Sequence, residues 1–394
     1  MKNYAVICEY NPFHFGHEYQ ISKIKEQGGT VTAVMSGDFC QRGEVALADK
    51  YDRARMAIAG GADLVLELPF PYSAAGAEKF AFGGVDIISR LGFADAISFG
   101  SECGDAELIK RTAENVLTDK FTNTLAENLR SEREKPYGTV YFETYNSLFG
   151  EGVFSGSNNI LGVAYASQII KNQIPLEITT VKRAGEDYNG GGVGYPSATS
   201  IREALSEKGM DAIVDMLPEH CFSILKEVQS RGELCSAEKL FPVYAAFLRT
   251  HKTEDFAGLA ENDASLASRL IKAGANSTNL RELYTAACTK KYSPSHVRRA
   301  LLFAYFGVTE EMLSQPPAYT VVLAANDTGR SLLAQAKHNS DIPIITKPAN
   351  YDKCGEKVAE AFEFSQRASA VRALAQEKPG SVADLMRKGP FVDK

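Results

Sequence analysis

The chain has 394 residues, of which 44% are hydrophobic and 23% charged, and its formal net charge is −6. This length exceeds one typical core and predicts two domains, and the acidic balance excludes a global positive field, so any nucleic-acid contact must be a local patch. The seven cysteines show no C-x-x-C spacing, which argues against a zinc site or a disulfide framework. The sequence shows no basic leader and no run of transmembrane length, so a cytoplasmic protein without a membrane partner is expected.

The first strand is expected at 4–8, and it leads through a polar turn into a helix that opens on the sequence HFGH at 14–17. The first N–H groups of a helix have no intrahelical partner and attract anions. Gly16 would let a phosphate approach the backbone, and His14 and His17 could offer ring N–H donors or positive charge. We interpret this junction as a site for nucleotide activation; the alternative is a pair of surface histidines in a turn.

Apolar segments alternate with helical patterns through the first half of the chain. Strands are expected at 4–8, 30–35, 63–68, 94–99 and 176–181, and helices at 15–27, 50–60 and 72–91. This repetition predicts an α/β fold, a Rossmann-like (HUP-type) doubly wound parallel sheet, followed by a mostly helical C-terminal domain. Parallel strands present their ligand crevice at their carboxyl ends, so the loops there are the candidates for a site.

Two of these loops carry suggestive residues. In the loop at 36–44, Asp38 or Glu44 could hold Mg²⁺ through water, and Arg42 could meet a phosphate or a carboxylate, although a solvated loop would look the same. Gly100 directly follows the fourth strand, where a nucleotide base or ribose often touches backbone; a tight turn is the alternative.

Further polar groups follow before the fifth strand and after it. Of Asn158 and Asn159, one can cap the next helix and the other could read a base edge or a ribose. Arg183 ends the fifth strand and is expected to point a cation into the crevice of the two histidines, which favours phosphate binding over a random surface position. The glycine-rich run at 187–195 is expected to form a mobile lid.

A second helix start offers hydroxyl groups to an anion. Ser197, Thr199 and Ser200 open this helix, and Arg202 lies in its first turns. Hydroxyls and a cation at a helix N-terminus predict a second anion-binding terminus, as a triphosphate would need.

Beyond residue 207 helical patterns dominate, so the domains are expected at 1–207 and 208–394. Two short strands are expected within the second domain, at 319–325 and 342–345, on either side of a helix.

A basic window in this second domain contains no acidic residue. It includes Lys290, Lys291, Arg298 and Arg299, with Tyr292 among them. Cations beside a stackable ring suit an RNA backbone and an unstacked base, so we expect tRNA contacts here; a solvated helix start is the alternative.

The chain resembles the tRNA(Met) cytidine acetate ligase family, within the HxGH nucleotidyltransferase superfamily, over about residues 1 to 349. The matching segments are EYNPFHFGH, MSGDFCQRGE, DLVLELPFPY, FGSE, SNNILG, SATSIR, KKYSPSHVRRALL, YTVVLAANDTGRSLL and ITKPA. The resemblance implies that acetate and ATP form acetyladenylate and pyrophosphate, and that the acetyl group then passes to the exocyclic amine of the wobble cytidine in elongator tRNA(Met). Two segments depart from the family pattern. SGSNNILG has Gly-Ser where Lys-Pro or Gln-Pro is common, and AANDTGR replaces a more basic run, which puts some C-terminal RNA contacts in doubt.

The family's site residues are carried over by position. The catalytic residues are expected to be His14, His17 and Arg183. The expected ATP-binding residues are Ile7, Cys8, Glu9, Tyr10, Asn11, Pro12, Phe13, His14, Phe15, Gly16, His17, Glu18, Tyr19, Gln20, Gly100, Asn158, Asn159 and Arg183, with Ser197, Thr199 and Ser200 from the second helix start. The expected tRNA-binding residues are Lys290, Lys291, Arg298 and Arg299. Mg²⁺ is expected to accompany ATP, with no resident metal site.

Three other interpretations are weighed against this one. A class I aminoacyl-tRNA synthetase would carry a lysine-rich KMSKS-type loop after the fifth strand, and the sequence has none. A small-molecule adenylyltransferase, of the pantetheine-phosphate or nicotinamide-nucleotide type, would leave the helical second domain unexplained. A non-enzymatic RNA-binding protein would have no reason to keep the intact HFGH motif.

Overall fold

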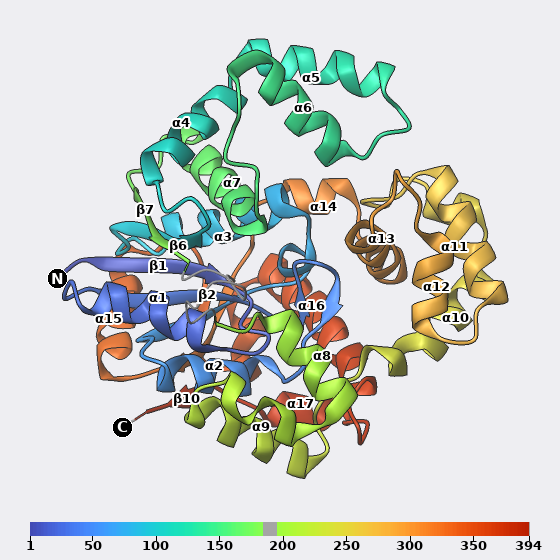
Figure 1. Cartoon of the computed structure of the whole chain (residues 1–394). Coiled ribbons are helices and arrows are strands. Elements are labelled where there is room, and N and C mark those ends of the chain that lie inside the picture. Colours follow the sequence, from blue (N-terminus) through green and yellow to red (C-terminus); the bar gives the residue numbers. More distant parts are fainter. Residues whose placement is uncertain (184–194, 394) are drawn as a thin grey trace.

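The structure, a computed structural model, describes residues 1–183 and 195–393 (Figure 1). Its centre is an eight-stranded sheet in the order β10-β8-β5-β2-β1-β6-β7, with β9 paired to β8. These strands are β1 (Asn3–Cys8), β2 (Thr30–Ser36), β5 (Leu64–Leu68), β6 (Ala96–Ser101), β7 (Glu177–Lys182), β8 (Thr320–Ala325), β9 (Ile344–Ile345) and β10 (Phe391–Val392), and β3 (Phe39–Cys40) pairs separately with β4 (Glu44–Val45). Strands β1, β2, β5, β6 and β7 run parallel, which confirms the predicted doubly wound sheet.

Helices surround this sheet and extend beyond it. They are α1 (Phe15–Lys25), α2 (Lys50–Ala59), α3 (Ala77–Arg90), α4 (Ala106–Val116), α5 (Asp119–Ser131), α6 (Tyr137–Phe149), α7 (Ser157–Lys171), α8 (Ala198–Lys208), α9 (Glu219–Arg231), α10 (Phe241–Thr250), α11 (Ala264–Asn276), α12 (Leu280–Ala287), α13 (Pro294–Phe306), α14 (Glu310–Ser314), α15 (Asp327–Asn339), α16 (Glu356–Leu374) and α17 (Val382–Arg387). The short 3₁₀ turns include η2 (Met210–Met216) and η5 (Pro348–Cys354). Among the described residues, no helix has the length and apolar character needed to cross a bilayer.

The alternation of side chains along β1 divides the core between two faces of the sheet. Ala5 and Ile7 pack with α3, α4 and α7 on one face, and Tyr4, Val6 and Cys8 pack with α1, α2 and α9 on the other. Successive strand residues point to opposite faces, so a strand that is apolar throughout must be covered on both sides. This double cover leaves the carboxyl ends of the strands as the place where loops can form a site.

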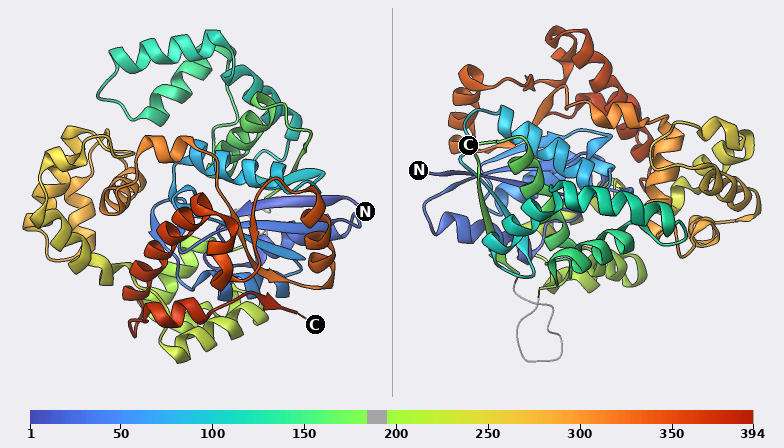
Figure 2. Two further views of the ribbon diagram at one scale, coloured as in Figure 1. Left: turned by 180° about the vertical axis from the view of Figure 1, so that it is seen from behind. Right: turned by 90° about the horizontal axis from the view of Figure 1, so that it is seen from above.

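The C-terminal part of the chain returns to this sheet. Strand β8 pairs antiparallel with β5, where Leu64 lies opposite Ala325, and β9 and β10 pair with β8. Seen from behind, the orange and red C-terminal segments lie against the blue strands (Figure 2). Without β8, strand β5 would expose an unpaired edge. A domain boundary after residue 207 would therefore divide this sheet, because the strands expected at 319–325 and 342–345 belong to it.

Two helical parts stand away from the sheet. The chain between β6 and β7 carries the α5–α6 hairpin, and the helical lobe, residues 241–306, comprises α10 to α13 (Figure 1). The helices of the lobe pack on one another through apolar side chains such as Leu248, Leu270, Leu283 and Leu301. The helical character predicted for the second domain thus holds for this lobe.

One buried cation fixes the ends of β1 and β2. Arg53 of α2 is fully buried, and its Nη1 donates to the carbonyl oxygen of Glu9 at 2.6 Å. Its Nη2 donates to the carbonyls of Ser36, at 3.0 Å, and Gly37, and its Nε donates to Ala48 O at 3.1 Å. A guanidinium carries five N–H donors in a rigid fork, so one side chain can satisfy carbonyls from several segments. Arg53 therefore sets the spacing of the loops that follow β1 and β2.

We expect the substitution Arg53→Met to lower the free energy of unfolding by about 3–5 kcal/mol, because several buried carbonyls lose their donors together. The matched control is Arg55→Met on the same helix. Arg55 is more exposed and pairs with Asp52 and Glu227, so its loss should cost at most about 1 kcal/mol. Urea unfolding of the two variants measures both values, and equal losses would contradict the role given to Arg53.

Candidate active site

The two histidines of the HFGH motif are fixed by the start of α1. His14 is the N-cap, and its Nδ1 accepts a hydrogen bond from the N–H of Gly16 at 3.1 Å. In return, His17 Nδ1 accepts from the N–H of His14 at 3.2 Å. The two rings stack, with centroids 3.7 Å apart and planes 22° apart. Because each Nδ1 is an acceptor, each neutral ring carries its proton on Nε2, and the site gains a pair of parallel N–H donors.

Both histidines are held in the neutral form. Burial lowers the pKa of His14 to about 3, and the nearby Arg183 guanidinium adds to this effect. Burial also lowers the pKa of His17 well below its usual value, with further contributions from His14 and Arg183. From the sequence, the two rings could have acted as neutral N–H donors or as positive charges. Their lowered pKa values favour the neutral form, so we interpret them as neutral donors.

Gly16 has a packing reason as well as a binding one. A Cβ atom at this position would lie 3.0 Å from His14 Cε1 and 3.1 Å from His14 Nδ1. These contacts are tighter than a side chain normally tolerates, so any larger residue would displace the ring. The glycine thus keeps the backbone open for a ligand and also leaves room for the capping imidazole.

In the expected ATP-binding segment 7–20, some side chains are buried in the protein and others lie at the start of α1. Ile7 and Cys8 belong to β1, and Tyr10, Asn11 and Phe13 are buried. The Tyr10 ring lies 4.7 Å from that of His17, and Asn11 Oδ1 accepts from Leu47 N at 2.8 Å. We infer that these side chains hold the loop in shape, while the helix start with its two histidines faces the crevice.

Arg183 follows β7 at the carboxyl ends of the strands, on the same edge of the sheet as the HFGH motif. Its N–H donates to the carbonyl of Ser101 at 2.9 Å, which places it directly beyond the paired ends of β6 and β7. The stem of Arg183 passes close to Gly100, since a Cβ there would lie 3.6 Å from Arg183 Cγ. Its charge lowers the pKa of His14 and His17, so the structure brings together all three predicted catalytic residues.

Glu102, which our sequence interpretation did not assign to the site, occupies the start of α7. Its carboxylate accepts from the N–H and Nδ2 of Asn158, at 3.2 and 2.7 Å, and from the N–H of Asn159 at 2.8 Å. Asn159 is buried, and its Oδ1 accepts from Glu102 N at 3.0 Å and Cys103 N at 3.2 Å. This helix terminus is therefore already filled by a carboxylate, and Asn159 anchors the loop beside Gly100. An acid directly after a strand, in FGSE, was the available signal.

The start of α8 lies beside the HFGH loop, where Arg202 reaches the carbonyl of Asn11. Ser197 Oγ accepts from the N–H of Ser200 at 3.2 Å, which caps the helix. Arg202 donates to the carbonyl of Asn11 at 2.7 Å and to Glu44 Oε2 at 2.5 Å. Arg202 is thus engaged in joining α8 to two loops of the site. The hydroxyls of Ser197 and Ser200 also donate within the cap, at 3.2 and 2.9 Å, so they would have to exchange these hydrogen bonds to meet an anion. The predicted lid at 187–195 lies outside the described residues except for its last one, Tyr195.

The carboxylates proposed for Mg²⁺ already have partners. Asp38 is buried, accepts from Ser369 Oγ at 2.5 Å and lies 3.6 Å from Arg372. Glu44 pairs with Arg202 and, at 3.2 Å, with Arg298. Both carboxylates are therefore used to hold segments together, which disfavours either as a free metal ligand.

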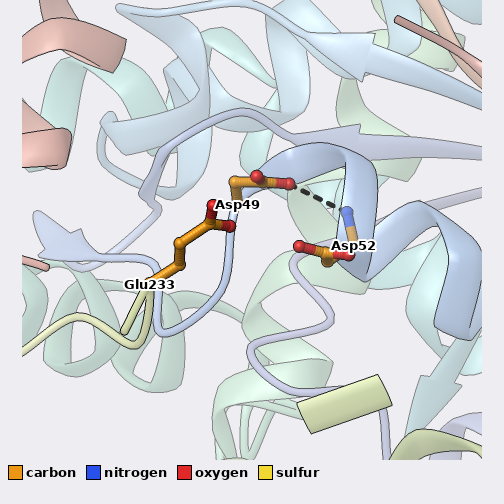
Figure 3. Close-up of side chains that lie close together, drawn as sticks. All are labelled: Asp49, Asp52 and Glu233. Carbon is orange, nitrogen blue, oxygen red and sulfur yellow. Dashed lines mark hydrogen bonds between the residues drawn. The ribbon is translucent and has the colours of Figure 1, made fainter. Parts of the chain in front are cut away.

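Three carboxylates elsewhere have the spacing of metal ligands. Asp49, Asp52 and Glu233 each place an oxygen within 4.8 Å of the others (Figure 3). However, Lys388 bonds to Asp49 and, at 2.9 Å, to Glu233, and Arg231 lies 2.5 Å from Asp52 and 3.1 Å from Glu233. These cations offset the negative charges, so we interpret the cluster as an ion-pair network that ties α2 to the end of α9 and to the C-terminal segment.

Several cations of the basic window form ion pairs or hydrogen bonds within the protein, which the sequence did not indicate. Arg299 pairs with Glu261 at 2.8 Å, and Lys291 pairs with Asp263 at 3.1 Å. Arg298 donates to the carbonyl of Arg42 at 3.0 Å and pairs with Glu44, so it joins α13 to the loop at 36–44. Within the described part of the chain, Lys290 is exposed and forms no ion pair. The sequence missed these pairings because the acids lie outside the window.

Known proteins share this architecture. The family model described as HIGH Nucleotidyl Transferase matches residues 1–384. The tRNA(Met) cytidine acetate ligase of Acetivibrio thermocellus is 33% identical, with 96% of each chain covered, and that of Caldanaerobacter subterraneus is 33% identical, covering 95% of this chain and 96% of the relative. The crystal structure of Thermotoga maritima TmcAL bound with alpha-thio ATP superposes with a TM-score of 0.91 and 28% identity, covering 100% of this chain and 99% of that one.

The neutral histidines predict a particular dependence of stability on pH. Because the folded pKa of His14 is lowered from 6.5 to about 3, the unfolded chain binds the proton first, and the free energy of unfolding falls as the pH drops below 6.5. Each such histidine contributes a loss of up to about 1.4 kcal/mol per pH unit. The variant His14→Asn keeps an oxygen for the cap and removes one titrating group, so its slope should be clearly smaller than that of the wild type.

Urea unfolding at about pH 7 and about pH 5.5 measures this slope. If His14→Asn kept the wild-type slope, the assignment of a buried neutral ring at this position would be wrong.

Proposed function

The chain belongs to the tRNA(Met) cytidine acetate ligase family, and on that premise we propose how its site carries out an ATP-dependent ligation on tRNA. In a first step, acetate and ATP form acetyladenylate and pyrophosphate. In a second step, the acetyl group passes to the N4 amine of the wobble cytidine of elongator tRNA(Met). A tRNA substrate agrees with a cytoplasmic location.

The observation that carries the proposal is the pair of stacked, neutral histidines at the start of α1, with Arg183 near them. Their Nε2–H groups supply hydrogen-bond donors that carry no net charge, while the N–H groups of His14 and Gly16 are already used by the cap. Donors fixed in a partly dry site stabilise the charge that develops on phosphate oxygens, and they need no reorganisation during the reaction. Arg183 adds the full positive charge that the histidines do not provide.

In the first step an acetate oxygen attacks the α-phosphorus, and the bond to the oxygen that bridges the α- and β-phosphates breaks. We assign His14, His17 and Arg183 to the charge that accumulates on the α-phosphate and on the leaving pyrophosphate. The protein otherwise contributes position, by holding the carboxylate and the phosphate in line. We assign the hydroxyls of Ser197, Thr199 and Ser200 at the start of α8 to the outer phosphates, because a helix N-terminus favours anions.

No covalent acyl-enzyme is needed. The nearby thiols, Cys8 and Cys40, are buried, and burial raises the pKa of both above the ordinary range. A thiol kept protonated is a poor nucleophile. Direct attack of the cytidine amine on the mixed anhydride is therefore the simpler second step, with AMP as the leaving group.

We propose that Mg²⁺ reaches the site on the phosphates of ATP and keeps much of its water. This agrees with the engagement of Asp38 and Glu44 by arginines, since Mg²⁺ is commonly held by substrate phosphates and water with few protein ligands. The metal would then supply charge neutralisation on the phosphates.

A small-molecule adenylyltransferase and a binding-only protein are the remaining alternatives. The match to the ligase relatives extends over the helical lobe as well as the sheet, and neither alternative gives that lobe a use. An acetate-dependent exchange between pyrophosphate and ATP separates all three, because it needs the adenylate of this carboxylate.

We expect the wild-type protein to exchange labelled pyrophosphate into ATP only when acetate is present, and His14→Asn to lose this exchange by about 100- to 1000-fold, because an oriented donor is removed from the phosphate site. The exposed His251→Asn should retain wild-type exchange. Exchange that does not depend on acetate would count against the ligase assignment, and full exchange in His14→Asn would remove this histidine from the catalytic step.

For tRNA binding, we expect Lys290→Ala to weaken the affinity for tRNA and to reduce the slope of log affinity against log salt by about 1, since Lys290 is the exposed cation of the basic window. The exposed Lys110→Ala on α4 is the control. Filter binding at several salt concentrations gives the slope, and an unchanged slope would exclude Lys290 from the RNA contact.

A further inference from the structure

A hollow opens beside the HFGH motif and has no role in the chemistry described so far. Its volume is about 370 Å³, within the range of small-molecule sites. It is lined by Phe15, Val214, Asp215, Leu217, Glu219 and Phe222. The walls therefore come from the first residue of α1, from η2 with the turn after it, and from the start of α9.

The hollow borders the start of α1, because its lining residue Phe15 belongs to the HFGH motif. Phe15 directly follows His14, and its ring lies 6.0 Å from that of Tyr195, just before α8. On the other wall, His220 lies between the lining residues Glu219 and Phe222, and its ring is 6.3 Å from that of Phe13. A group bound in the hollow would thus lie next to the helix start at which the acyl group is activated.

The charge of the residues that line the hollow disfavours the anionic ligands of this reaction. The walls offer two aromatic rings, Phe15 and Phe222, and two carboxylates, Asp215 and Glu219, with no cation among them. Carboxylates repel acetate and phosphate, so neither acetate nor the triphosphate fits here. A flat base with an exocyclic amine does fit, because aromatic rings stack on its face and carboxylates accept from its N–H groups.

We propose that this hollow receives the cytosine base of the tRNA, with Phe15 and Phe222 against its face and Glu219 accepting a hydrogen bond from its N4 amine. This proposal rests on the proposed ligase function. A nearby cation agrees with it: Lys226 Nζ lies over the Phe222 ring, 5.6 Å from its centre, and supplies positive charge beside the hollow for the phosphate backbone.

Glu219 would then be a catalytic residue for the second step. The N4 lone pair attacks the carbonyl carbon of acetyladenylate, and an N–C bond forms. The bond from that carbon to the phosphate oxygen breaks, and its electron pair leaves with AMP. The N4 atom loses one proton, which the Glu219 carboxylate accepts and later returns to water.

Two substitutions test the assignment, each with the full chain. For Phe222→Ala we expect affinity for an elongator tRNA(Met) transcript to fall roughly 5- to 100-fold, the usual loss when a stacking ring is removed. For Glu219→Gln we expect single-turnover acetyl transfer from preformed acetyladenylate to fall about 100-fold. Asp211→Asn, an exposed residue of η2 outside the hollow, is the matched control and should transfer at the wild-type rate.

The two steps of the reaction separate this inference from the proposed function. Acetate-dependent exchange in wild type tests the function, and near wild-type exchange in both variants shows that they fold and bind ATP and acetate. A raised KM for ATP would instead assign the hollow to adenine, and a raised KM for acetate would assign it to the carboxylate; either result overturns the inference. Unchanged transfer by Glu219→Gln overturns the catalytic role.

A transcript with uridine in place of the wobble cytidine tests the contact between Glu219 and the base directly. A purely structural role of Glu219 would not change the preference for cytidine over uridine. Uracil presents a carbonyl where cytosine has its amine, so wild type should bind the cytidine transcript more tightly. Glu219→Gln, whose amide can donate to that carbonyl, should lose most of this preference. A preference that survives the substitution would contradict the contact between Glu219 and the base.

Discussion

The site depends on how the buried guanidinium of Arg53 holds the carboxyl ends of the first two strands. The carbonyls that gather there, from Glu9, Ser36, Gly37 and Ala48, would repel one another and any phosphate brought near them. The buried Arg53 side chain donates hydrogen bonds to these carbonyls from inside the protein. The start of α1 above them can then receive an anion, with the two histidine rings as its donors.

A second constraint joins the site to the helical lobe. Glu44 pairs with Arg202, which also holds the carbonyl of Asn11 in the HFGH loop, and with Arg298 on α13. This carboxylate therefore touches the start of α8 and the lobe expected to contact tRNA, and its partner Arg202 reaches the loop after β1. The adenylate site and the lobe are held in a fixed relation, as two steps on substrates of very different size require.

Local signals in the sequence were sufficient for the parallel strands, the HFGH helix start and the position of Arg183, because strand periodicity, turn residues and strand ends are properties of short segments. Partners distant in sequence were not predictable. The pairing of β8 with β5 could not be predicted, because the sequence does not show that β5 would otherwise be an edge strand. The ion pairs of Arg298 and Arg299 could not be predicted either, because their partners Glu44 and Glu261 are distant in the sequence. The neutral state of His14 follows from burial, which the motif alone does not reveal.

The most direct test of the account is mass analysis of the nucleosides of an elongator tRNA(Met) transcript after incubation with the protein, ATP and isotopically labelled acetate. The account predicts that labelled N4-acetylcytidine forms at the wobble position, and only when ATP and acetate are both present. An unmodified transcript, despite release of pyrophosphate from ATP, would contradict it.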